Sequence, residues 1–213
     1  MCGAGSESGP AFVIPEPVPD DTALWLIRHG ETTWSKSGQH TSRTELPLTP
    51  DGEKQAAALG AMLANVHPVF VLSSPRVRAL RTAELAGLKV DDIDPDLVEW
   101  DYGEYEGLTT AEIRERAPGW SLWTHPVPGG ETPREVAVRA DRVLTRALPY
   151  LAEGPVIFVA HGHISRVIGA RWIGLAAQDG GRLTLGTAAP SVLGGEHRSP
   201  VIERWNLPNP AAP

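Results

Sequence analysis

The chain has 213 residues, of which 41% are hydrophobic and 21% charged, a globular composition that favours one domain with one core. Its formal net charge of −7 disfavours nucleic acid and anionic membranes as partners, because both bind basic surfaces. No apolar run approaches the roughly 18 residues that cross a bilayer, so no membrane segment is expected.

Both ends of the chain are predicted to be tails, because they are rich in Pro and small residues. We place these tails at residues 1–21 and 208–213, and a single domain at residues 22–207. The first twenty residues contain no Lys or Arg with which a secretory signal would begin, and Cys2 is the single cysteine. We therefore expect a cytoplasmic protein.

Three continuous apolar runs, at residues 23–27, 69–72 and 156–160, predict strands that are buried on both faces. Each run ends in polar residues. Two later segments, at residues 191–194 and 201–205, are predicted as closing strands, at least one of them antiparallel.

Helical patterns lie between these strands. Thr49-Pro50 and Ser74-Pro75 each place a capping residue before a proline, which predicts two helix starts. The segment 132–135 has the form of a capping box and opens the longest helix, which runs to about residue 152. The alternation predicts an α/β fold, a three-layer α/β/α sandwich with a mostly parallel central sheet.

The polar residues after the three runs are of types that bind phosphate. They are Arg28-His29-Gly30, Ser73-Ser74-Pro75 leading to Arg78, and His161-Gly162-His163. Because parallel strands end at the same edge of a sheet, two arginines and two histidines are expected around one crevice. Arg78 lies in the first turn of its helix, where side chains lean toward the amino end and thus toward that crevice.

These motifs resemble those of the histidine phosphatase superfamily, also called phosphoglycerate mutase-like. The resemblance covers about residues 23–205. Its motifs are residues 28–32, residues 47–49 with Gly52 and Gln55, residues 74–79 with Thr82, Glu99 before Tyr102-Gly103, and residues 160–162.

The resemblance, strongest to the acid phosphatase branch, implies a phosphomonoesterase that forms a phosphohistidine on small phosphorylated metabolites. It implies that His29 attacks phosphorus, that Arg28, Arg78 and His161 hold the phosphoryl oxygens, and that Glu99 transfers the proton. The chemistry is sound, because a neutral imidazole is a nucleophile near pH 7 and two transfers replace one difficult displacement. No cofactor or metal is expected, since arginines can neutralise the phosphoryl charge.

Alternatives remain for the acid and for the histidine pair. Asp101, Glu104 and Glu106 are rivals of Glu99 as general acid, although Glu106 is expected to support its loop. His161 and His163 could ligate a metal, but no carboxylate stands at ligand spacing.

Further residues are expected to contact substrate: Gly30, Ser35, Thr41, Ser42, Glu131, Gly162 and His163. Gly30 allows close backbone approach, and Gly162 presents N–H groups at a helix start. Glu131 has the alternative role of complementing a helix N-terminus. Many relatives have Asn at Ser35 and Gln-Gly at Thr41-Ser42, so contacts from that loop stay open. Residues 34–39 resemble the loops of acid phosphatases and of sedoheptulose bisphosphatases.

Other functions are also open. A cofactor-dependent phosphoglycerate mutase is disfavoured by the short stretch between Glu99 and Gly129-Gly130, since a mutase must shield phosphohistidine from water. A sugar bisphosphatase and a phosphate-binding module without catalysis are the remaining alternatives. Trp120, Trp123 and His125 are expected either in the core or over the substrate. A homodimer is compatible with the sequence.

Overall fold

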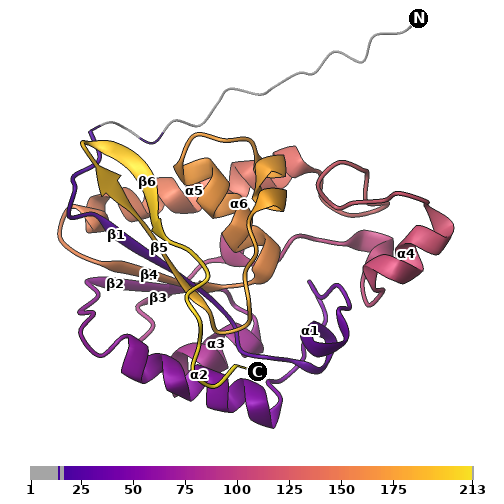
Figure 1. The fold of residues 1–213 in the computed structure, drawn as a ribbon, viewed down its shortest axis with the longest axis horizontal. Helices are drawn as coiled ribbons and strands as arrows, with labels where there is room; N and C mark the ends of the chain where they lie inside the picture. The colour runs from indigo at the N-terminus through magenta and orange to yellow at the C-terminus, as the bar shows by residue number, and fades with distance from the viewer. Residues whose placement is uncertain (1–13, 15–16, 213) are drawn as a thin grey trace, which may run out of the picture.

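The computed structural model of the chain describes residue 14 and residues 17–212. A six-stranded sheet with the order β3-β2-β4-β1-β5-β6 lies between two layers of helices (Figure 1). The strands are β1 (Ala23–Arg28), β2 (Phe70–Ser73), β3 (Asp92–Ile93), β4 (Val156–Ala160), β5 (Pro190–Glu196) and β6 (Ser199–Arg204). The helices are α1 (Thr33–Ser37), α2 (Pro50–Met62), α3 (Val77–Leu85), α4 (Thr110–Arg116), α5 (Pro133–Leu151) and α6 (Gly162–Trp172), with 3₁₀ turns η1 (Pro95–Leu97), η2 (Gly103–Tyr105) and η3 (Ala177–Arg182).

The predicted α/β/α sandwich with a mostly parallel sheet is confirmed. Strands β3, β2, β4 and β1 are parallel to one another, whereas β5 is antiparallel to β1 and β6 to β5. Strand β3 was not predicted, because two residues are too few to show a periodic pattern. Within the described chain, no helix combines the length and apolar character that spanning a membrane requires.

The core has two parts, one on each face of the sheet. Leu24 and Leu26 of β1 belong to the cluster that packs under α5 and α6, whereas Ile27 belongs to the cluster that packs on α2 and α3. This is the period of two expected for a strand.

The predicted helix starts are confirmed at two of three positions. Thr49 caps α2, and Thr132 forms a capping box at the start of α5. The prediction for Ser74-Pro75 is wrong, because α3 begins at Val77 without a side-chain cap. The Ser74 hydroxyl instead lies 2.8 Å from Nε2 of His161.

Residues beyond the predicted domain boundaries contact the domain. Ile14 and Val18 are buried in the core on the α5 and α6 face. At the other end, Asn209 is buried and donates from its side chain to the carbonyls of Gln55 and Ala188. Residues 1–13, 15–16 and 213, with Cys2 among them, lie outside the described residues, and the boundaries of the domain stay a prediction.

Candidate active site

His29 lies directly after β1, with its ring oriented by its own loop. Its Nδ1 lies 2.7 Å from the carbonyl oxygen of Gly30. Because a carbonyl only accepts hydrogen bonds, Nδ1 carries the ring proton and Nε2 keeps its lone pair. The backbone N–H of His29 donates to Ala160 at the end of β4, which joins two of the predicted motifs.

The surroundings of His29 favour the neutral imidazole. Burial lowers the pKa of His29 well below its ordinary value, and the positive charges of Arg28 and Arg78 lower it further. A neutral ring with a free Nε2 is the form of histidine that attacks phosphorus. Nε2 of His29 is therefore unprotonated, and able to act as a nucleophile, throughout the neutral range.

The guanidinium of Arg28 has some of its hydrogen-bond donors satisfied by the protein and one without a partner among the described residues. One terminal nitrogen donates to the Leu185 carbonyl at 2.6 Å, whereas the buried Nε has no hydrogen-bond partner among the described residues. A Cβ on Gly162 would lie 3.4 Å from Nε and Cζ of Arg28, so the glycine keeps space beside the guanidinium. An unsatisfied buried donor is costly, which indicates a place for an anion.

Arg78 and His161 lie beside each other directly behind His29. The Nε–H of Arg78 donates to Nδ1 of His161 at 3.2 Å, and the ring centroids of His161 and His29 are 5.2 Å apart. Burial and Arg78 lower the pKa of His161 well below its ordinary value, so the neutral ring donates from Nε2 to Ser74. The other nitrogens of Arg78 donate to the carbonyls of Thr41, Ser42 and Thr44, which fix the guanidinium.

Glu99 lies at the N-terminus of α6. Its Oε1 accepts from the backbone N–H of Trp100 and of Ile164, and its Oε2 accepts from that of His163, each at 2.9 Å. These contacts complement the positive end of the helix. They also hold the carboxyl group in the wall of the same pocket as His29.

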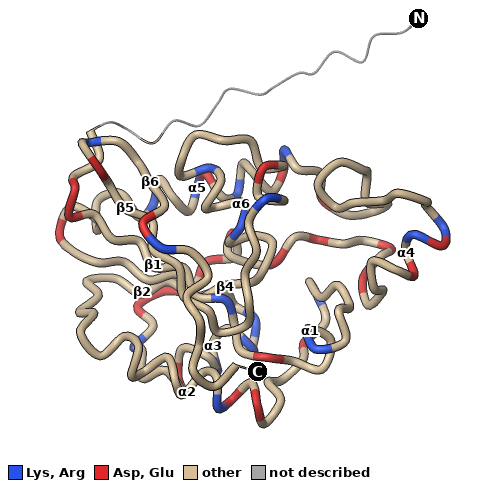
Figure 2. The backbone as a smooth tube through the Cα atoms, in the orientation of Figure 1, with Lys and Arg blue, Asp and Glu red and all other residues tan. Residues whose placement is uncertain are grey.

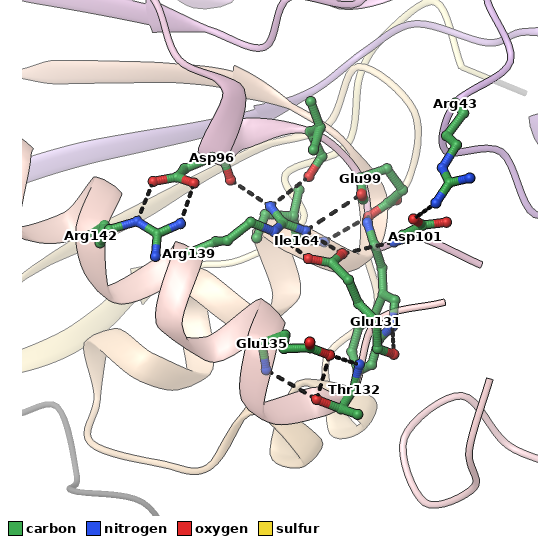
Figure 3. Close-up of polar contacts among 12 residues, drawn as sticks. Arg43, Asp96, Glu99, Asp101, Glu131, Thr132, Glu135, Arg139, Arg142 and Ile164 are labelled. Carbon is green, nitrogen blue, oxygen red and sulfur yellow. Dashed lines mark hydrogen bonds and ion pairs between the residues drawn. The ribbon is translucent and has the colours of Figure 1, made fainter. Parts of the chain in front are cut away.

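Glu131 holds the segment that follows Glu99 through hydrogen bonds to Trp100 and Asp101. Its carboxylate pairs with Nε of Arg139 at 2.7 Å and accepts from the backbone N–H of Asp101 at 2.9 Å. Arg139 reaches across from α5 to these groups and also donates to carbonyls of residues 96 and 98, as Figure 3 shows. Glu131 is thus part of the support of Glu99 and does not line the pocket.

The rival carboxylates of the Glu99 segment are engaged elsewhere. Asp101 pairs with Arg43 and accepts from the backbone of Gly103. Glu106 accepts from the backbone of Ser42 and Thr44, which holds the loop that carries the carbonyl partners of Arg78. Neither group lines the pocket, nor does Glu104.

The pocket in front of His29 has a volume of about 270 Å³, the size of a small metabolite. Of the residues predicted to catalyse, Arg28, His29 and Glu99 line it, whereas Arg78 and His161 are fully buried behind His29 and do not. Of the residues predicted to contact substrate, Ser35, Thr41, Gly162 and His163 line it. Gly30 and Ser42 do not: a Cβ on Gly30 would lie 2.4 Å from the Gly52 carbonyl oxygen, so packing against α2 requires this glycine. Ser42 is tied to Glu106.

Sequence reasoning missed half of the pocket lining. The missed residues are Gly38, Gln39, His40, Tyr102, Thr110, Arg166 and Leu185. Arg166 could have been found, because it lies one helical turn after Gly162 on the same face of α6. The others come from loops and from the start of α4, whose positions depend on distant contacts such as the bridge between Gln39 and Thr109.

The aromatic segment before Gly129 lies behind the pocket. Trp120 is buried in the core, and Trp123 packs edge-on against Trp100 and His163, with Arg166 above its ring. His125 contacts Ser121 and Thr124. None of these three lines the pocket, so the packing alternative holds for Trp120 and Trp123.

The charges of the chain are mixed in sign. Figure 2 shows acidic and basic residues interspersed, side by side in α4 for example. The attraction for an anion therefore comes from the local arginines at the pocket. In the part of the chain that is described, no group of three or more His, Cys, Asp or Glu is arranged to hold a metal ion.

The half-buried His40 is expected to make the stability of the protein depend on pH. Burial lowers the pKa of His40 from 6.5 to about 4, although Glu106 opposes the shift. Between these values the unfolded chain binds the proton and the folded protein does not. The free energy of unfolding should therefore be unaffected by His40 above pH 6.5 and should fall as the pH falls toward 4.

The substitution His40→Gln is expected to flatten this decline by up to about 1.4 kcal/mol per pH unit. Denaturant unfolding of both proteins at pH 7 and pH 5 measures the two slopes. The other buried histidines titrate in the same direction in both proteins and cancel in the comparison. Parallel slopes would show that His40 is not held neutral.

The chain is similar in sequence and fold to known phosphatases. Residues 24–208 match the histidine phosphatase superfamily (branch 1). An acid phosphatase of Mycobacterium tuberculosis is 46% identical over 176 residues, which are 82% of this chain and 87% of that protein. A sedoheptulose 1,7-bisphosphatase of Saccharomyces cerevisiae is 35% identical over 184 residues, covering 72% and 68%. The solved structure of an open reading frame product from M. tuberculosis has a TM-score of 0.86 at 43% identity, covering 89% and 99%.

Proposed function

Because the chain belongs to the histidine phosphatase superfamily (branch 1) and is a phosphatase, we propose that it hydrolyses small phosphate monoesters through a phosphohistidine on His29. The observation that carries this proposal is the bond between Nδ1 of His29 and the Gly30 carbonyl. It leaves Nε2 as an unprotonated nucleophile in a pocket that also contains Arg28 and Glu99.

The reaction has two steps. Nε2 of His29 forms a bond to phosphorus while the ester P–O bond breaks, and protonated Glu99 gives its proton to the departing oxygen. Water then attacks phosphorus, Glu99 takes the proton from that water, and the N–P bond breaks to release inorganic phosphate. Oε2 is the oxygen of Glu99 better suited to carry the proton, because it accepts one backbone bond whereas Oε1 accepts two.

Arg28, Arg78 and His161 are proposed to hold the phosphoryl oxygens. Arg28 lines the pocket, and its Nε has no hydrogen-bond partner among the described residues, which supports the first contact. A phosphoryl oxygen that replaced Nδ1 of His161 as the acceptor would take the hydrogen bond from Nε–H of Arg78. His161 would donate to the same oxygen in its other tautomer, with the proton on Nδ1 and Nε2 accepting from the Ser74 hydroxyl. At an effective dielectric constant near 20, each close cation–phosphate contact contributes a Coulomb attraction of about 4 kcal/mol, so a few contacts supply much of the needed stabilisation.

Hydrolysis is favoured over the mutase reaction, in which the phosphoryl group is transferred back to the substrate. A mutase must keep water from phosphohistidine, and the chain between Glu99 and Gly129 is short for a cover. The similarity to an acid phosphatase and to a sedoheptulose bisphosphatase supports small phosphorylated metabolites as substrates. A sugar bisphosphate is the second candidate, supported by that second relative. A phosphate-binding module without catalysis has no use for a nucleophile and a carboxyl acid in one pocket.

The test of the proposal is to trap the intermediate. Mixing the enzyme with radiolabelled phosphate ester and quenching in alkali, where phosphohistidine survives, should leave label on the protein. Peptide mapping should place it on His29. Label on Ser35 or on no residue of the protein would contradict the proposal.

The location and assembly of the protein are further proposals. A cytoplasmic location is supported by the single cysteine, Cys2, which cannot form an internal disulfide. A homodimer is compatible with the fold, and sedimentation at micromolar concentration distinguishes it from a monomer.

A further inference from the structure

His163 is fixed by Tyr102 in the part of the pocket wall next to Glu99. The Tyr102 hydroxyl lies 2.5 Å from Nδ1 of His163. Tyr102 is 2% exposed, and the His163 side chain is 21% exposed. Both residues line the pocket. The pair is therefore built into the wall, with part of the imidazole open to whatever the pocket binds.

In this pair the Tyr102 hydroxyl is the donor. A buried hydroxyl hydrogen needs an acceptor, and the described residues offer it no acceptor besides Nδ1 of His163. Burial and Glu99 raise the pKa of Tyr102 well above its ordinary value, and burial lowers that of His163 well below. The neutral imidazole therefore accepts at Nδ1 and carries its proton on Nε2.

The Nε2–H of His163 remains available to a ligand. No group in the described parts of the chain accepts a hydrogen bond from it. The backbone N–H of the same residue donates to Oε2 of Glu99, and Nδ1 lies 3.8 Å from that oxygen. Glu99 and His163 line one pocket, so a leaving group whose ester oxygen faces Glu99 lies in the pocket that the His163 ring also lines.

We propose that His163 is a specificity residue, which donates from Nε2 to a hydroxyl oxygen of the leaving group, and that Tyr102 positions it by fixing its tautomer. This inference rests on the proposed function, because the leaving oxygen must face Glu99. A hydroxyl is the group that fits, since a neutral imidazole offers one uncharged donor and adds no charge for a second anion. The preferred substrates are phosphate esters of polyols, with a hydroxyl one or two carbons from the ester oxygen.

Two esters with the same carbon chain isolate this hydroxyl contact. Glycerol 3-phosphate and propyl phosphate both have three carbons and an alkyl leaving group, and only the first has free hydroxyls. We expect the wild-type enzyme to favour glycerol 3-phosphate in kcat/KM by about tenfold, the size of one good hydrogen bond. A wild-type ratio near one would overturn the inference.

Substitutions that keep or remove the Nε2 donor provide the matched comparison. His163→Gln places an amide N–H near the position of Nε2, whereas the shorter His163→Asn reaches only the position of Nδ1. We expect Asn to remove the preference for glycerol 3-phosphate and Gln to retain it within about threefold. The exposed His67 gives the control, because His67→Asn should leave the ratio of the two esters unchanged.

Tyr102→Phe tests the positioning role. Without the phenol, His163 can present either a donor or a lone pair to the pocket, so the preference should fall by a few fold. In the His163→Asn background, Tyr102→Phe should lower the preference for glycerol 3-phosphate no further, because the two residues act through one contact. Equal losses for both esters in His163→Asn would overturn the inference while leaving the mechanism intact. A wild type that hydrolyses neither ester would overturn the proposed function itself.

Discussion

The substitution His29→Ala is expected to lower turnover by at least about 10⁴-fold, because no phosphohistidine can form. Ala removes the proposed nucleophile but leaves Arg28 in the wall of the pocket. Inorganic phosphate should therefore still bind and raise the melting temperature of the variant. Initial rates with a chromogenic ester and thermal melts with and without phosphate measure the two properties separately.

The matched control is His67→Ala, which removes an exposed imidazole far along the chain from the pocket residues. Turnover and phosphate stabilisation should both match the wild type. If His29→Ala lost less than about tenfold, another group would be the nucleophile. If it lost the phosphate effect as well, the loss of turnover would reflect a collapsed pocket instead of a missing nucleophile.

The convergence of the site residues could be predicted from the sequence, because it follows from local patterns. Strand β4 is a continuous apolar run and β1 is one up to its last residue, Arg28, and each strand is followed at once by its histidine, His161 or His29. Parallel neighbours end at one edge of the sheet, so the two rings had to meet there. In the structure, the ring centroids of His29 and His161 are 5.2 Å apart, as this reasoning predicts.

Which of several possible hydrogen-bond partners a polar side chain takes could not be predicted from the sequence. Ser74 before proline has the pattern of a helix cap, yet its hydroxyl bonds to His161 instead. Glu131 precedes a helix, yet it pairs with Arg139 two turns into that helix. Ser74 and His161 are far apart in the sequence, and Glu131 and Arg139 lie on a loop and a helix. Tertiary packing decides whether such pairs meet, and local sequence patterns do not encode it.

The wall of the pocket that includes His40 was missed for a related reason. His40 bonds through its backbone to Leu108 and Gly107, so two loops distant in sequence must meet before this wall exists. The family motifs contain the pocket residues Arg28, His29, Glu99 and Gly162, so the resemblance was enough to predict these. The rest of the lining depends on how this particular chain packs its loops.

The substitution Glu99→Gln is expected to reduce turnover of alkyl phosphates by roughly 10²–10⁴-fold, the usual contribution of general acid catalysis. The amide can retain its oxygen at the Oε1 position, which accepts from Trp100 and Ile164. Its NH₂ group then faces the backbone N–H of His163 in place of Oε2. One lost bond to backbone costs about 1 kcal/mol, so thermal melts should show a folded, slightly less stable protein.

The loss should depend on the leaving group, and this dependence separates proton transfer from phosphate binding. A nitrophenolate leaves without protonation, so single-turnover phosphorylation of His29 by nitrophenyl phosphate should suffer far less than phosphorylation by a sugar phosphate. Single turnovers are needed because slow hydrolysis of phosphohistidine, which also uses Glu99, would hide the contrast in the steady state. Asp101→Asn is the matched control: Asp101 pairs with Arg43 outside the pocket, so its loss should not discriminate between the esters. Equal losses for both esters in Glu99→Gln, or discrimination in Asp101→Asn, would transfer the acid role away from Glu99.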